Sequence, residues 1–140
     1  MHRRRVVRDA TVARLMGLPL TGDRVYSGAR ASRNLPDERM PAIRVHTPSE
    51  QMQSEGITLG YASPYHRITV RLEILAKAAD EVENVIDDVC EQVEGRFDTD
   101  PTLGGVVRQI DYQSTDTDFE DEDQAVMQAT LTFEAEFIQE

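Results

Sequence analysis

The sequence HRITVRLEIL, at residues 66–75, decides the fold because its side chains alternate strictly between apolar and polar. Ile68, Val70, Leu72 and Ile74 lie on one face of an extended chain, with charged or hydroxylated residues between them. A period of two over this length is typical of a β-strand with one buried face. Residues 66–75 therefore predict a strand that covers a hydrophobic core on one side only.

An amphipathic helix is predicted next, at residues 80–95. Its apolar residues recur at three- and four-residue steps, which is the spacing of one helical face. They are Val82, Val85, Ile86, Val89, Val93 and Phe97. Asp80 is the expected N-cap and Glu83 its capping-box partner, while Gly95 and then Pro101 predict the end. The opposite face of this helix is acidic.

Two strands at residues 105–113 and 125–138 predict an antiparallel hairpin. The second strand again alternates, with Met127, Leu131 and Phe133 among the residues of its apolar face. Between the strands lies the acidic run DTDFEDED at residues 116–123, which we expect to be a turn.

The N-terminal part of the sequence is less regular. Residues 3–16 predict a helix with an arginine-rich exposed face, ended by Gly17 and Pro19. Residues 19–41 mix Pro, Gly, Ser and Asn with arginine, so a long loop or arm is expected; segments of this length are commonly functional or ordered by a partner. Residues 42–47 predict a short strand and residues 49–64 a second polar connection.

These elements predict a single α+β domain at residues 1–140, with a largely antiparallel sheet of about four strands, two helices packed on one face and a long N-terminal Arg-rich loop. The chain has 140 residues and a mass of 15.8 kDa, which is the usual size of one domain. We expect no membrane span, because the longest uncharged stretch, residues 56–66, is polar, and no secretory signal, because residues 1–17 contain no apolar core and no small-residue cleavage site.

Charge is divided unevenly along the chain. Residues 1–44 hold ten arginines and four acidic residues, a formal charge of +6, whereas residues 45–140 hold five basic and 22 acidic residues, a formal charge of −17. Such asymmetry favours association between the positive part of one molecule and the negative part of another. The alternative is that both parts are ordinary solvated surface.

Candidate metal sites do not match a binding pattern. Asp116, Asp118 and Glu120 have the spacing of a calcium loop, but Asp121 replaces its glycine and Met127 its final glutamate. Asp87, Asp88 and Glu91 could gather carboxylates on one helix turn, as a nuclease needs, but no histidine accompanies them. A solvated turn and a solvated helix face are the favoured interpretations.

The sequence also contains no recognised set of catalytic residues. The three histidines, His2, His46 and His66, belong to no recognised catalytic motif, and Cys90, the only cysteine, lies beside the apolar stripe of a helix. Gly104-Gly105 precedes a strand, so a turn is favoured over a phosphate cradle. We therefore expect no enzyme activity, no catalytic residue, no cofactor and no bound metal.

Five segments in this order resemble the tail terminator, or minor tail, proteins of long-tailed bacteriophages. They are AIRVHTPSE from residue 42, HRITVRLEILAKA from 66, DEVENVIDDVCEQVEGRF from 80, TDPTLGGVVRQIDYQSTD from 99 and AVMQATLTFEAEF from 125. The resemblance covers most of the chain. It rests on the order and the general character of these segments, with a loosely matching TLGG sequence before two strands. Related neck and tail-completion proteins look similar.

This resemblance implies a virion protein, assembled in the host cytoplasm, that forms a ring, usually of six copies, on the tail tube. The ring would end tube polymerisation and present a surface to the head connector, while genome DNA passes through its lumen without specific binding. A head–tail joining or tail-completion protein is the alternative, and a metal-dependent nuclease accessory a further one.

The expected interface with another copy or partner consists of arginines. These are Arg3, Arg4, Arg5, Arg8, Arg24, Arg30, Arg33 and Arg39. They are predicted to contact acids of an adjoining copy, with the loop becoming ordered on assembly.

Overall fold

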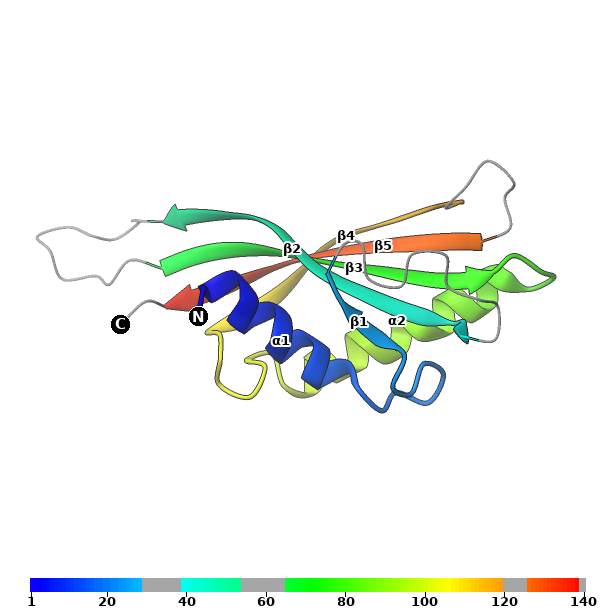
Figure 1. Cartoon of the computed structure of the whole chain (residues 1–140), viewed down its shortest axis with the longest axis horizontal. Helices are drawn as coiled ribbons and strands as arrows, with labels where there is room; N and C mark the ends of the chain where they lie inside the picture. Colours follow the sequence, from blue (N-terminus) through cyan, green and yellow to red (C-terminus); the bar gives the residue numbers. More distant parts are fainter. Residues whose placement is uncertain (29–38, 54–64, 120–125, 139–140) are drawn as a thin grey trace, which may run out of the picture.

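The computed structural model describes residues 1–28, 39–53, 65–119 and 126–138, in which two helices lie on one face of a five-stranded sheet (Figure 1). The elements are α1 (Arg3–Leu15), β1 (Val25–Ser27), β2 (Ala42–Gln53), β3 (Tyr65–Lys77), α2 (Val82–Thr99), β4 (Gln109–Phe119) and β5 (Val126–Ile138). Their order across the sheet is β1-β2-β3-β5-β4, and only the β1–β2 pair is parallel. The predicted α+β class is confirmed, with five strands instead of about four.

Strand β3 lies at the centre of the sheet, as its alternating sequence requires. It pairs with β5 without a register shift, from Tyr65 opposite Ile138 to Lys77 opposite Val126. The side chains of Ile68, Val70 and Leu72 are fully buried, and those between them are partly exposed. One face of the sheet is therefore apolar and borders the core, and the other face is polar.

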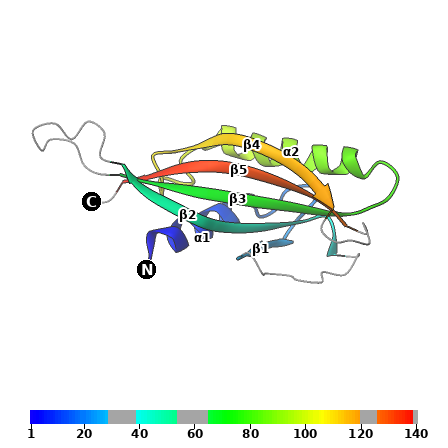
Figure 2. The same ribbon diagram turned by 90° about the horizontal axis from the view of Figure 1, so that it is seen from above.

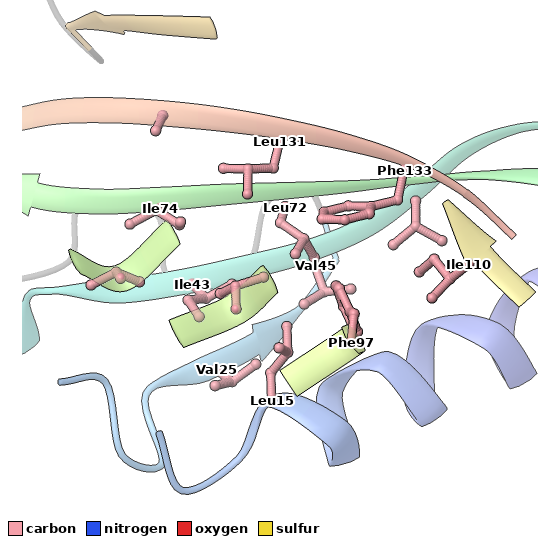
Figure 3. Packing of buried hydrophobic residues seen from close by; sticks show 14 of the residues in the cluster. Leu15, Val25, Ile43, Val45, Leu72, Ile74, Phe97, Ile110, Leu131 and Phe133 are labelled. Atoms are coloured by element: carbon pink, nitrogen blue, oxygen red, sulfur yellow. The ribbon is translucent and has the colours of Figure 1, made fainter. Parts of the chain in front are cut away.

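The core lies between this apolar face and the two helices. Helix α1 packs on β1 and β2, and α2 packs on β3. Figure 3 shows Leu15 of α1 and Phe97 of α2 pointing toward the strand residues Ile43, Leu72 and Phe133. Phe97 and Phe133 meet edge to face with ring centroids 4.9 Å apart, a geometry that aromatic pairs prefer. The predicted apolar stripes of α2 and β5 thus meet in one cluster.

The segment predicted as a loop at residues 19–41 contains the short strand β1. Val25 is buried and pairs with Ile43, and the Ile43 amide donates to the carbonyl of Arg24, 3.0 Å away. Three residues are too few to show a period in the sequence, so this strand was missed. The part of the predicted loop at residues 29–38 lies outside the described residues.

Strand β2 is longer than the predicted strand at residues 42–47. It runs through Pro48 to Gln53, with a register shift against β3 between His46 and Ser49. Such a bulge accommodates a proline, which has no amide hydrogen for the ladder. The predicted connection at residues 49–64 therefore begins later, and its residues 54–64 are not among those described.

Helix α2 does not begin with the predicted Asp80 capping box. Its N-cap is Glu81, which has a left-handed backbone with φ of 67° and makes no side-chain capping bond. The amide of Val82 instead donates to the carbonyl of Ala79. The helix continues past Gly95 to Thr99, because burial of Phe97 in the core outweighs the low helix propensity of one glycine.

The predicted antiparallel hairpin is confirmed, but its first strand lies later than residues 105–113. Gly104 and Gly105 have φ of 72° and 88°, and they form the turn that leads into β4. Asp116 and Asp118 belong to β4 rather than to a turn, opposite Thr130 and Gln128 of β5. Their carboxylates are exposed, so a strand accommodates them without desolvation.

Reciprocal arginine contacts join the C-terminal ends of the two helices. The Arg14 guanidinium donates to the backbone carbonyl of Arg96 at 2.9 and 3.2 Å. Arg96 in turn donates to the carbonyls of Arg14 and Met16, at 3.1 and 3.2 Å. Cations are favourable at helix C-termini, where carbonyls lack partners. These hydrogen bonds stabilise the packing of α1 against α2.

The start of α1 and the end of β5 lie at the same end of the molecule (Figure 1). In the described segments, no helix combines the length and the apolar character needed to cross a membrane.

Candidate functional site

The predicted interface arginines that the structure describes lie mainly along one long edge. Arg3, Arg4, Arg5 and Arg8 belong to α1, and Arg24 directly precedes β1. Figure 2 shows α1 and β1 along one side of the molecule, with β4 and α2 along the opposite side. We call the surface of these five arginines the arginine edge. Arg39 is exposed just before β2, whereas Arg30 and Arg33 lie outside the described residues.

Two of these arginines surround Glu50 of β2. Arg3 binds both carboxylate oxygens of Glu50, and the Nε of Arg4 lies 3.8 Å from Oε1. His2 and His66 approach the same carboxylate at 3.4 and 3.6 Å. This cluster fixes the start of α1 to β2 and β3. Sequence reasoning missed Glu50 because it fell within a predicted connection.

Arg8 and Arg24 make a different kind of contact, to neutral oxygen atoms. The Nε of Arg8 donates to Ser27 Oγ at 3.1 Å, and its Nη1 donates to Thr47 Oγ1 at 3.3 Å. Arg24 donates to the carbonyls of Pro41 and Leu20, at 3.0 and 2.8 Å. Among the residues described, no carboxylate forms an ion pair with either side chain. Both therefore contribute an uncompensated positive charge to the arginine edge.

Arg5 is the most exposed member of the arginine edge that forms an ion pair. Its Nε lies 3.8 Å from Asp9 one helical turn away, and 63% of the Arg5 side chain is exposed. An exposed pair of this kind contributes little free energy and exchanges readily for another partner.

The opposite edge of the molecule is acidic. Strand β4 ends the sheet, and its Asp111, Asp116 and Asp118 are exposed. Beside it, Glu94 and Asp98 of α2 line a hollow of about 330 Å³ whose apolar wall includes Ile110, Phe133 and the half-exposed Tyr112. Asp116 and Asp118 line a separate hollow, which they share with Arg71. We call these five acids together the acidic edge.

A largely buried polar cluster lies on the sheet face away from the helices. Arg44 Nε lies 3.2 Å from Glu73 Oε1, and Gln128 donates to the other oxygen of Glu73 at 2.9 Å. His46 Nε2 is 3.6 Å from Glu73. The cluster fixes β2, β3 and β5 relative to one another, because each strand contributes a member.

Burial lowers the pKa of His46 below 6.5, despite the carboxylate beside it. Desolvation of the charged form is the largest cause; Glu73 opposes it, while Arg71 and Arg44 add to the lowering. The desolvation of His46 outweighs its attraction to Glu73, 3.6 Å away, because Arg44 already neutralises the Glu73 carboxylate. His46 is thus a neutral imidazole at neutral pH.

Cys90 is half-buried against the core on α2. Burial, and then the charges of Glu94 and Asp87, raise the pKa of its thiol to about 11. A thiol with this pKa is a poor nucleophile, which fits the expected position of Cys90 beside the apolar stripe of a helix.

The TLGG sequence is part of a turn organised by Asp100. Its carboxylate accepts from the Thr102 hydroxyl at 2.6 Å and from the amide of Gly104 at 2.8 Å. These hydrogen bonds, the Thr102 bond foremost, lower the pKa of Asp100. The carboxylate of Asp100 occupies this turn and repels phosphate. The two glycines therefore allow the chain to turn toward β4.

No group of three or more His, Cys, Asp or Glu side chains that could hold a metal ion occurs in residues 1–28, 39–53, 65–119 and 126–138. Of the calcium-loop candidates, Glu120 and Asp121 are not among these residues.

No protein-family model matches this chain, and no curated protein matches it. Its fold is similar to that of a chain in the solved structure "Virion of native gene transfer agent (GTA) particle". The TM-score is 0.53 and the sequence identity is 11%, over 95% of each chain. The similarity therefore concerns the fold of nearly the whole chain.

Proposed function

We propose that this chain is a structural protein of a phage-like virion. Its similarity in fold to a chain of a gene transfer agent virion, over 95% of both chains, is the observation that carries the proposal. A match over nearly full length means that the whole domain, rather than one common motif, has the same architecture. Fold similarity alone does not identify a function, so the surfaces must also suit assembly.

The surfaces suit assembly through charge. An arginine edge and an acidic edge lie on opposite sides of one molecule (Figure 2). Molecules with two unlike complementary surfaces associate head to tail, and such contacts close into a ring or continue as a filament. A ring, which the sequence resemblance implies to be a homohexamer, is the form proposed for this chain.

The specific role proposed is that of a tail terminator. The ring would cap the head-proximal end of the tail tube, end tube polymerisation and offer a docking surface to the head connector, with DNA passing through its lumen. Arg39 and the arginine edge would contact acids of a neighbouring copy, of the tube protein or of the connector. Its action rests on these contacts and not on bond-making chemistry.

Electron microscopy of particles lacking this protein tests the role. Overlong tails are expected if the protein ends tube growth. Tails of normal length that remain detached from heads would instead indicate a head–tail joining or tail-completion protein, which is the alternative. Intact particles with normal tails would contradict both assignments.

A further inference from the structure

Strand β4 is the outermost strand of the described sheet; the Ile110 amide near its start donates to the carbonyl of Pro101, and beyond that point its outer edge pairs with no other described strand. It pairs with β5 on one side, and it is the last strand in the sheet order. Ten of its eleven residues are exposed. Open edges invite pairing with another chain, and proteins commonly protect them with charge. The partner that this edge accepts is therefore decided by its charges.

Pairing of β4 with β4 of another copy is disfavoured by those charges. A two-fold contact would place side by side two strands that each carry Asp111, Asp116 and Asp118, and like charges across a strand pair are destabilising. Glu94 and Asp98 add negative charge beside the strand. A partner for this edge must bring positive charge.

Such a partner is available on the same molecule's opposite side. Arg8 and Arg24 keep uncompensated charges within the described residues, and Arg5 holds only an exposed pair with Asp9. The half-exposed ring of Tyr112, flanked by acids, offers a face on which a guanidinium can stack. Opposite positions of the two edges leave both accessible in each copy.

We propose that the acidic edge, formed by β4 and the end of α2, binds the arginine edge of a second copy of this chain. The contact is heterologous, so each copy uses both edges at once. This inference deepens the proposed function: it rests on assembly of copies with one another and assigns the two surfaces that meet.

A charge-swap experiment tests this assignment. One variant, Asp111→Arg with Asp116→Arg, reverses charges of the acidic edge. The other, Arg5→Glu with Arg8→Glu, reverses charges of the arginine edge. Either variant alone is expected to self-associate about tenfold more weakly than the wild type, in line with the loss of interfacial charge pairs. An equimolar mixture is expected to recover assembly, because each reversed edge then meets a complementary one. Sedimentation velocity at low ionic strength provides the measurement.

A neutral variant and a fold measurement distinguish loss of the interface charge from loss of folding. Asp111→Asn with Asp116→Asn removes the charge without placing arginine near Arg71, and circular dichroism verifies the fold of every variant. The matched control is Asp87→Arg with Asp88→Arg, on the exposed acidic face of α2 outside the acidic edge, which is expected to leave association unchanged.

Three results would overturn the inference. The first is a wild-type chain that stays monomeric at low ionic strength. The second is association of the folded acidic-edge variants as strong as that of the wild type, and the third is an equimolar mixture that does not recover assembly. None of these results decides the virion role, because the imaging of particles that lack the protein tests that role separately.

Discussion

At the scale of single residues, His46 links the stability of the fold to pH. Its pKa is lowered mainly by burial, so the unfolded chain, with a histidine pKa near 6.5, binds the proton more readily than the folded chain. The stabilising contribution of neutral His46 is therefore complete above pH 6.5 and decreases as pH falls through 6.5 toward the folded-state value.

We predict that His46→Gln reduces the acid sensitivity of stability. Urea unfolding at several pH values between about 7.5 and 5.5 measures the slope of the unfolding free energy against pH. Arg71→Gln removes a smaller cause of the lowering and should keep most of the slope. An unchanged slope in the His46 variant would show that other groups dominate this pH range.

The raised pKa of Cys90 predicts slow reaction with thiol reagents. At a pKa of about 11, against an ordinary value of 9.0, the thiolate population at pH 8 falls by about 100-fold. Iodoacetamide should therefore modify the folded protein about 100-fold more slowly than the urea-unfolded protein. Mass spectrometry of timed samples gives the two rates, and equal rates would contradict the burial of this thiol.

At the scale of elements, the Arg14–Arg96 contacts hold the two helices together. Each guanidinium satisfies carbonyl groups at the end of the other helix. We predict that Arg96→Ala lowers the unfolding free energy by about 1–2 kcal/mol, since hydrogen bonds from charged donors to partly buried carbonyls are lost. Arg108→Ala is the matched control, because 62% of the Arg108 side chain is exposed and its 3.6 Å pair with Glu136 contributes little.

A double-mutant cycle with Arg14→Ala tests whether the two sets of hydrogen bonds are independent. Each guanidinium donates to backbone carbonyls, which alanine retains, so the two losses should add. Losses that do not add would mean that the two arginines are coupled through the packing of the helices.

Elements with a long, regular pattern were predictable from sequence, whereas those set by tertiary context were not. Strand β3 and the apolar stripe of α2 follow directly from periodicity. Strand β1 has three residues and depends on pairing with β2, and the start of α2 depends on the left-handed backbone of Glu81. Strand β4 continues through acids because an exposed edge leaves their charges in water.

The candidate surfaces were predictable only in their charge. The arginines of α1 were identified, but their engagement by Glu50 was not, because it depends on the bulge between His46 and Ser49 that sets the later register of β2. The sequence pattern predicted a turn at Asp116 and Asp118, which lie in β4, whereas Asp111 was within a predicted strand. Which acids meet which arginines is a property of sheet order, and local sequence does not encode it.

At the scale of the whole molecule, separated charge makes association sensitive to salt. Surface charges are screened beyond a Debye length of about 10 Å at 0.1 M salt. We predict that raising sodium chloride from about 20 mM to 500 mM weakens wild-type self-association strongly, as light scattering would show. The Asn variants of β4 should depend less on salt. Association that strengthens with salt would indicate an apolar contact instead.

Because α1 begins and β5 ends at the same end of the molecule, the elements can keep their arrangement under a different linear order. A glycine-serine connector from the end of β5 to the start of α1, with new ends opened at the exposed Gly104-Gly105 turn, would produce a circular permutant in which we expect every strand pairing to be retained. In that permutant the freed termini would sit beside the start of β4, where an added tag would act as a removable steric block of subunit contact.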